Sequence, residues 1–132
     1  MVKEEELQQQ YMQMQMLQQQ MEEVNQYLQV LMQQNADLDV SIEAVQQLGQ
    51  AKVNNALLAP IANGIFIKSE LKDNQTLIVN VGTDVTVEKT VPEVVKLLNQ
   101  QKQKLSQEIY GMDNLLQDLN QQMMQIYEQV QN

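Results

Sequence analysis

Two long stretches of the sequence place apolar residues at heptad positions a and d, and this repeat limits the folds open to the chain. Taking residue 7 as position a, ten of the twelve a and d positions in residues 7–45 are apolar, and the exceptions are Gln10 and Asn35. In residues 91–130, eleven of twelve are apolar, and the exception is Lys102. Six heptads in one register predict a coiled-coil helix in each stretch, with these a and d residues as its seam.

The two seams are expected to pair with each other. A helix with an apolar stripe gains most of its stability by packing that stripe against a partner. Because the seams have equal length and one short segment joins them, the simplest arrangement is an antiparallel helical hairpin. Residues whose numbers sum to about 140 then face each other. This register places Leu28 against Met112 and Met14 against Ile126.

Local signals set the limits of the helices. Gly49 follows the first seam, and helices often end on glycine. Thr90 and Glu93 have the spacing of a capping box, which predicts the start of the second helix. We therefore expect one domain over residues 1–132, with a helix over 4–49, a middle segment over 50–90 and a helix over 91–131.

The middle segment is predicted to form short strands. Alternating apolar and β-branched residues predict strands over 64–71, 76–81 and 85–88, with turns between them, and a short strand over 56–59 that Pro60 ends. The predicted fold class is α+β, a long antiparallel coiled-coil helical hairpin with two central β-hairpins.

Such a small sheet leaves its edges and apolar side chains uncovered. We expect it to oligomerise; the alternative is a monomer whose sheet folds back on its own helices. The side chains predicted to share the apolar face that makes this oligomerisation contact are Ile65, Ile67, Leu77, Val79, Val81, Val85 and Val87.

Composition excludes several classes of function. The chain has no His and no Cys, so thiol nucleophiles, His-based proton transfer and Cys/His zinc sites are excluded. Its four glycines are isolated and form no phosphate-binding loop. A net charge of -9 with eight lysines and no arginine disfavours binding to nucleic acid or anionic membrane. We expect no enzyme activity, no metal and no cofactor, and a cytoplasmic protein without a membrane span.

The middle segment resembles the α-class subunits of prefoldin, a molecular chaperone. The resemblance rests on Leu58-Ala59-Pro60-Ile61, Gly64, Phe66, Lys68 and Leu71, and then on Val79-Asn80-Val81-Gly82 and Val87-Glu88-Lys89. Ala62-Asn63 and Thr83-Asp84 depart from the glycine-rich turns of that family. The number of predicted strands favours the α class, because a β-class subunit would have one hairpin.

The resemblance implies a function and partners. It implies an α2β4 hexamer with β-class prefoldin subunits, in which the hairpins form a β-barrel platform. The coiled-coil tips would capture unfolded proteins without ATP and deliver them to a group II chaperonin. The alternative is a structural subunit that acts as a scaffold or forms filaments, with little client binding.

Methionines near the chain ends are the candidate client-binding residues. Methionine at a or d fills gaps in a seam, but Met12, Met16 and Met124 fall at f, c and b, which face solvent in a two-helix hairpin. Flexible thioethers adapt to many partner shapes. We expect the client-binding tip to include Met12, Met16, Leu17, Met21, Met123, Met124 and Tyr127. The alternative is that these are scattered apolar surface residues of no consequence.

The same ends of the chain are acidic. Residues 1–24 and 112–132 hold eight carboxylates and one lysine, Lys3. These charges either keep the helices solvated or attract basic segments of clients or of the chaperonin. Only attraction predicts that salt weakens the interaction.

Overall fold

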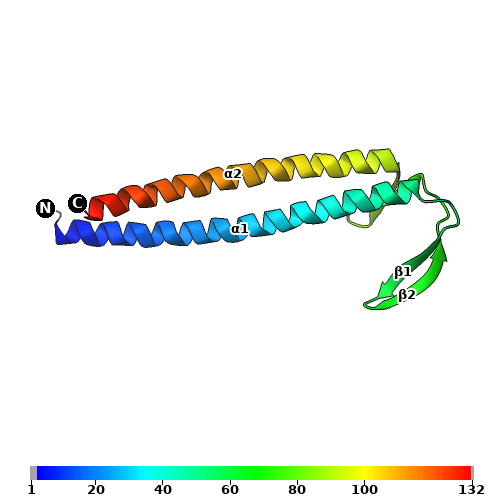
Figure 1. Ribbon diagram of the computed structural model, residues 1–132, viewed down its shortest axis with the longest axis horizontal. Helices are drawn as coiled ribbons and strands as arrows, with labels where there is room; N and C mark the ends of the chain where they lie inside the picture. Colours follow the sequence, from blue (N-terminus) through cyan, green and yellow to red (C-terminus); the bar gives the residue numbers. More distant parts are fainter. Residues whose placement is uncertain (1–2, 132) are drawn as a thin grey trace. The chain divides into compact units, whose positions relative to one another are not determined.

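The computed structural model describes residues 3–131 and contains two long helices separated by four strands (Figure 1). The order is α1 (Glu4–Gln50), β1 (Ala56–Ala62), β2 (Ile65–Glu70), β3 (Thr76–Gly82), β4 (Val85–Thr90) and α2 (Val91–Gln131). Both helices begin and end within a residue of the predicted limits. The predicted α+β fold class is confirmed, while the assignment of the whole chain to one domain stays a prediction.

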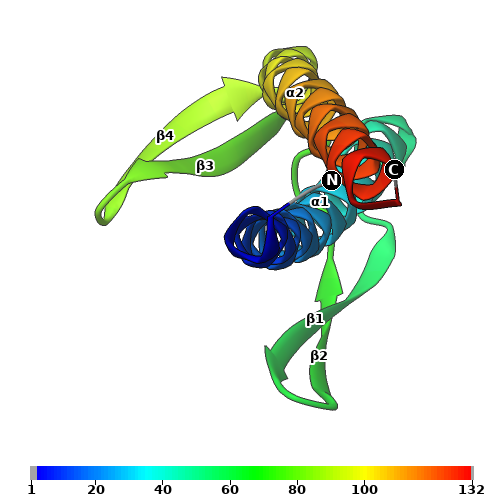
Figure 2. The ribbon, with the colours of Figure 1, turned by 90° about the vertical axis from the view of Figure 1, so that its left-hand side faces the viewer.

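The chain divides into two compact units. The helical unit contains the described residues up to Ala36 and those from Gln103 onward, and the hairpin unit is Asp37–Lys102. The first therefore holds the N-terminal part of α1 and the C-terminal part of α2, which lie side by side in Figure 1 and Figure 2. The second holds the remaining helical segments and all four strands.

The predicted seam is the apolar core of the paired helices. Every a and d position of both stretches is buried or half-buried, including the polar residues at these positions. Leu28, Leu31, Leu105 and Leu119 are the most deeply buried seam residues, and Leu31 is only 3% exposed. The heptad pattern thus predicted which face of each helix is covered.

Three polar pairs between α1 and α2 agree with the predicted antiparallel register. In the helical unit, the Gln10 side-chain amide donates to Gln129 over 3.4 Å, and the Tyr27 hydroxyl donates to Glu108. In the hairpin unit, Lys102 forms an ion pair with Asp39. The residue numbers of these pairs sum to values close to the expected figure of about 140.

The β strands form two separate hairpins that repeat each other at a spacing of 20 residues. β1 pairs antiparallel with β2 from Ala56–Glu70, and β3 pairs with β4 from Thr76–Thr90. Each ladder has an irregularity near the end of its first strand, where Ile61 and Val81 lack a direct partner. These are bulges, which bend and twist a strand pair.

The two hairpin turns also match. Gly64 and Asp84 occupy equivalent positions and both have left-handed backbone, with φ of 79° and 60°. Glycine adopts this conformation freely, and aspartate is one of the few other residues that tolerate it. Thr83-Asp84 therefore makes the same turn as Asn63-Gly64. In these described residues the hairpins form no closed barrel, which the prediction assigned to an assembly of several chains.

The prediction that Pro60 ends the first strand is wrong. β1 continues through Pro60 to Ala62, and Pro60 lies opposite Phe66 next to the bulge. In a two-stranded sheet each strand is an edge on one side, and proline is tolerated at edges and bulges because its missing N–H then removes no essential ladder bond.

Gly49 has a different role from the predicted one. It lies inside α1, which continues to Gln50, and the one glycine with left-handed backbone among the described residues is Gly64. A Cβ at Gly49 would lie 2.9 Å from Cγ1 of Val91, the first residue of α2. The missing side chain therefore allows the end of α1 and the start of α2 to approach closely.

Side chains fix the junctions between helices and hairpins. The N-cap bond of the predicted capping box is present, because the Glu93 backbone N–H donates to the Thr90 hydroxyl over 3.3 Å. The Glu93 carboxylate accepts from the same hydroxyl over 3.1 Å. At the end of α1, the Asn74 amide donates to the Ala51 carbonyl over 2.8 Å. The bonds to the Glu93 N–H and to the Ala51 carbonyl satisfy backbone groups that a helix end leaves without partners.

A turn between the hairpins is held by Asp73. Its carboxylate accepts hydrogen bonds from the Thr76 hydroxyl and from the backbone N–H groups of Gln75 and Thr76. These bonds favour the charged form and lower the pKa of Asp73, with the Thr76 hydroxyl as the largest cause. The turn contribution of Asp73 is therefore present above its unfolded-state pKa and is lost as pH falls through the lowered folded-state pKa.

Candidate functional site

The helical unit exposes apolar side chains outside its seam. Met12, Met16 and Met124 are 63%, 60% and 57% exposed, and Tyr127 is 51% exposed. Their heptad positions explain this, because f, c and b point away from the partner helix and e, the position of Tyr127, flanks the seam. Four of the seven predicted client-binding residues thus lie on the surface of the helical unit.

The other three predicted client-binding residues belong mainly to the seam. Leu17, Met21 and Met123 are half-buried at a or d positions. They are therefore already used in packing α1 against α2, and they reach solvent only in part.

More exposed apolar residues share this unit than were predicted. Tyr11 precedes Met12 and is 52% exposed, and its place at heptad position e was the available signal. Both helices contribute the others, all outside a and d, so a strict reading of the heptads would have found them: Tyr27, Val30, Met32, Tyr110 and Leu115.

Charge differs between the two units. The hairpin unit carries eight acidic residues and six lysines. The helical unit carries only two lysines, Lys3 and Lys104, against Glu4, Glu5, Glu6, Glu22, Glu23, Glu108, Asp113, Asp118 and Glu128. One of these carboxylates, Glu108, accepts the hydrogen bond from Tyr27 and raises the pKa of that hydroxyl. The exposed apolar residues thus lie on a strongly acidic unit.

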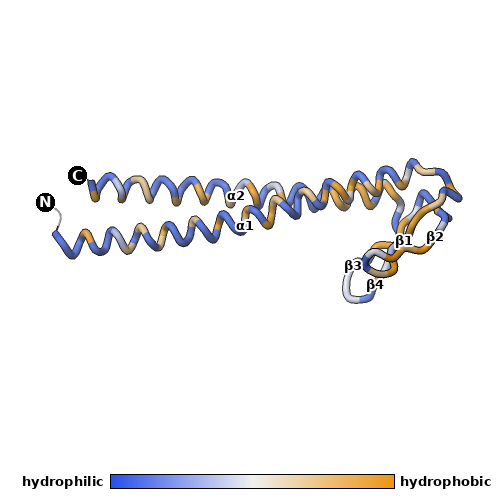
Figure 3. The backbone as a smooth tube through the Cα atoms, turned by 60° about the horizontal axis from the view of Figure 1, so that its bottom comes forward, coloured by the Kyte–Doolittle hydropathy of each residue, from blue (hydrophilic) through white to orange (hydrophobic). Residues whose placement is uncertain are grey.

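The hairpins expose apolar side chains on both faces. Of the predicted oligomerisation residues, Leu77, Val79 and Val87 are half-buried, and Ile65, Ile67, Val81 and Val85 are exposed. Val79 lies directly opposite Val87, so alternation along the strands places Leu77, Val79, Val85 and Val87 on one face of β3 and β4. Ile65 and Ile67 likewise share one face of β2, and Val81 lies at the bulge of β3. The strong hydrophobic colouring of β1 and β2 in Figure 3 contrasts with the alternating colours of the helices.

The opposite faces differ between the two hairpins. In the first hairpin this face carries Leu58 and Phe66, 67% and 55% exposed. In the second hairpin, Ile78 takes the place of Leu58, but polar Thr86 takes the place of Phe66. Leu57 and Leu58 lie inside the predicted strand over 56–59 but were not assigned to the interface, and Ile61 was missed because β1 was predicted to end at Pro60.

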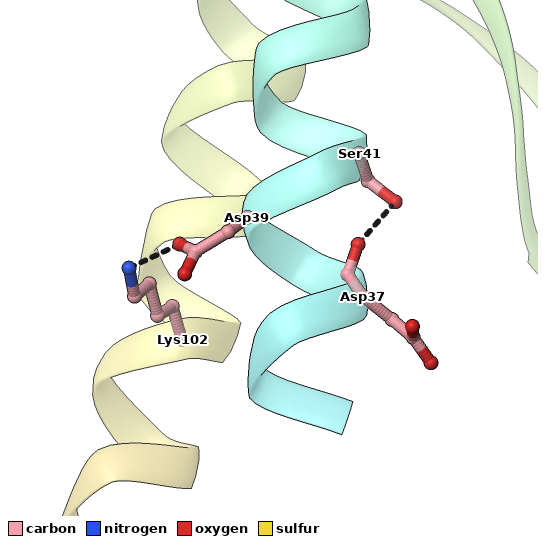
Figure 4. A network of polar contacts seen from close by, with 4 residues as sticks. All are labelled: Asp37, Asp39, Ser41 and Lys102. Carbon is pink, nitrogen blue, oxygen red and sulfur yellow. Dashed lines mark hydrogen bonds and ion pairs between the residues drawn. The ribbon is translucent and has the colours of Figure 1, made fainter. Parts of the chain in front are cut away.

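A polar contact in the hairpin unit interrupts the seam (Figure 4). Lys102 replaces an apolar residue at position a, and its ammonium group meets the carboxylate of Asp39 on α1. One turn of α1 beyond Asp37, the Ser41 hydroxyl donates to the Asp37 carbonyl over 3.0 Å. The ion pair compensates the charge of Lys102 in this register, and a polar a position is a known means of fixing coiled-coil register.

The described residues give no support for a metal site or a membrane span. Between residues 3 and 131, no three acidic side chains gather closely enough to hold a metal ion. Over the same residues, neither helix has an apolar stretch that could cross a bilayer.

Comparisons with known proteins agree with the fold and the sequence pattern. The prefoldin subunit alpha of Thermofilum pendens is 27% identical over 99 residues, which cover 75% of this chain and 74% of that relative. The prefoldin subunit alpha of Methanococcus aeolicus is 35% identical over 91 residues, which cover 69% of this chain and 61% of the relative. The matched part is therefore less than two thirds of the length of the methanococcal protein.

A solved structure supports the same fold. The cryo-EM structure of filamentous PFD from Methanocaldococcus jannaschii superposes with a TM-score of 0.80, covering 90% of this chain and 98% of that chain, at 15% identity. At this identity the likeness concerns the fold alone. The family model for prefoldin subunits matches residues 17–132. Because this match covers most of the sequence, the chain belongs to the prefoldin subunit family, whose members are chaperone subunits.

Proposed function

We propose that this chain is an α-class prefoldin subunit that captures non-native proteins on the helical unit without ATP. The observation that carries the proposal is the exposure of Met12, Met16, Met124 and Tyr127 outside the seam. A soluble helix pair has no structural need for these apolar side chains, since its seam is already filled. Flexible thioethers suit a surface that must accept many different apolar segments.

Assembly is the second part of the proposal. The hairpins expose more apolar surface than one chain covers, and their outer strand edges are unpaired. We propose that they join with β-class prefoldin subunits in an α2β4 hexamer, with a β-barrel platform built from hairpins of several chains. The apolar face that includes Val79 and Val87 would form the barrel interior.

Delivery to a group II chaperonin in the cytoplasm completes the proposed role. The acidic surplus of the helical unit supports attraction to basic segments of clients or chaperonin. This part predicts weaker binding at higher salt, whereas capture by apolar side chains alone predicts little change.

The experiment that tests client capture replaces the exposed thioethers by amides. The chain is assembled with a β-class partner and mixed with a chemically denatured test protein in the absence of nucleotide. The variant Met12→Gln, Met16→Gln, Met124→Gln is expected to lose most of the suppression of aggregation that the unmodified complex shows. Val40→Gln is the matched control, because Val40 is 67% exposed but belongs to the hairpin unit. Full suppression by the triple variant would refute capture by these methionines.

A scaffold or filament-forming subunit is the second candidate function. Its support is the fold likeness to a filamentous prefoldin and the uncovered faces of both hairpins. The two candidates differ in the same assay. A scaffold subunit assembles fully yet leaves the denatured protein to aggregate.

A further inference from the structure

The sulfur of this chain is confined to one of its two units. The sequence has nine methionines and no cysteine, and all nine lie outside residues 37–102. The hairpin unit therefore contains no sulfur. An oxidant that attacks sulfur can modify the helical unit while leaving the proposed assembly segment unchanged.

The described methionines fall into two groups of accessibility. Met12, Met16, Met32 and Met124 are 57% to 63% exposed. Met14, Met21, Met112 and Met123 occupy a or d positions and are half-buried. Because oxidation follows solvent access, the first group is expected to react before the second.

We propose that Met12, Met16 and Met124 form a reversible oxidation site that switches off client capture; this inference rests on the proposed holdase function. The oxidant is a peroxide. The thioether sulfur attacks the protonated peroxide oxygen, an S–O bond forms, the O–O bond breaks, and the proton of the attacked oxygen passes to the leaving oxygen. The sulfur loses two electrons, and the peroxide is reduced to water or an alcohol. The product is methionine sulfoxide, which reductases return to methionine at the expense of thiols.

The consequence follows from polarity. A sulfoxide is polar, so it removes the apolar character on which the proposed capture depends. The seam methionines are shielded in part, and the most buried seam residues are leucines, which peroxide does not oxidise. The coiled coil and the assembly therefore remain intact while the outer surface changes. With no cysteine in the chain, no thiol competes for the oxidant.

The test compares the assembled complex before and after treatment with hydrogen peroxide. Peptide mapping by mass spectrometry gives the order of oxidation, and aggregation suppression gives function. A leucine variant, Met12→Leu, Met16→Leu, Met124→Leu, keeps the apolar surface but has no thioether there. Each complex is compared with its own untreated sample: oxidation is expected to reduce suppression several-fold in the unmodified complex and little in the leucine variant. Methionine sulfoxide reductase with dithiothreitol should restore suppression.

Two controls separate the site from its surroundings. Met32→Leu removes an equally exposed thioether outside the proposed site and should remain as sensitive to peroxide as the unmodified chain. Thermal unfolding by circular dichroism should be unchanged by oxidation, which shows that the seam is intact. Equal sensitivity of the triple leucine variant, or oxidation of Met14, Met21 and Met123 as fast as the exposed three, would overturn the proposal.

Failure of the proposed function gives a different result. In that case the untreated complex does not suppress aggregation, and neither does the untreated leucine variant. The proposed client capture and the proposed oxidation switch are then both overturned. A complex that captures clients equally well before and after full oxidation of Met12, Met16 and Met124 overturns the switch alone.

Discussion

The paired helices and the β-hairpins of this chain treat their apolar residues in opposite ways. In the paired helices the seam side chains bury one another, and Leu31 is only 3% exposed. In the hairpins, Ile78 on one face is 71% exposed and Ile65 on the other is 55% exposed. The helices thus complete their core within one chain, whereas the hairpins do not. The difference indicates that the exposed apolar side chains of the hairpins drive assembly, because only contact with other chains can bury them.

The largest expected effect comes from placing charge on the proposed inner face of the second hairpin. Val79 and Val87 lie directly opposite each other, so Val79→Asp with Val87→Asp puts two like charges in contact. Burying them in an assembly costs far more than the valine contacts contribute. We expect loss of the hetero-oligomer by size-exclusion chromatography with light scattering, with helix content retained.

The matched control for this pair lies on the other face of the same strands. Asn80 and Thr86 are also directly opposite each other and are exposed. Asn80→Asp with Thr86→Asp introduces the same charges and should leave the oligomer assembled. Equal disruption by both variants would contradict the assignment of the inner face.

A core truncation in the helices should have the next largest effect. Leu31→Ala removes the most deeply buried seam side chain and is expected to lower the free energy of unfolding by about 2–4 kcal/mol. Chemical denaturation followed by circular dichroism measures this change. Met32→Ala, one residue away and 60% exposed, should cost less than about 1 kcal/mol. Similar losses at both positions would mean that the seam is not the core.

The junction between β4 and α2 is expected to give a smaller effect. Thr90→Ala removes the hydroxyl that accepts from the Glu93 N–H, so α2 loses its N-cap. The expected loss of stability is about 1 kcal/mol, measured by the same denaturation. Thr90→Ser keeps the hydroxyl and should stay close to the unmodified chain; if the serine variant were as unstable as alanine, the cap would not explain the loss.

The two helical glycines should respond with opposite signs. Gly111 has open space where a Cβ would lie, so Gly111→Ala is expected to stabilise α2 by up to about 1 kcal/mol. Gly49→Ala places a Cβ 2.9 Å from Val91 and should destabilise the contact despite its better helix propensity. Melting temperatures of the two variants should therefore move in opposite directions, and a shared increase would show that the close approach is unimportant.

Local patterns account for most of what the sequence predicted. The heptads predicted the covered face of both helices, and Thr90 with Glu93 predicted the start of α2, because both signals depend only on residues a few positions apart. The predicted end of β1 was wrong because Pro60 is tolerated beside a bulge. The bulge depends on pairing with β2 and cannot be read from β1 alone. The predicted role of Gly49 was wrong because its missing side chain makes room for Val91, and Val91 is distant in sequence.

The candidate sites could be predicted only in part for a related reason. Heptad position separated exposed Met12 and Met16 from half-buried Met21, but the prediction grouped them by residue type and proximity. Pairs such as Tyr27 with Glu108 depend on how α1 is aligned with α2. The heptad pattern of one helix alone does not determine that alignment. Neither the periodicity nor the composition identifies which chain covers the hairpins.

The most direct test of this account removes the ends of the helical unit and leaves the hairpins unchanged. A chain lacking residues 1–22 and 118–132 is assembled with a β-class partner, and its ability to keep a denatured protein soluble is measured beside the full-length complex. The account predicts that the shortened complex still assembles but no longer suppresses aggregation. Undiminished suppression by an assembled complex without these ends would contradict it.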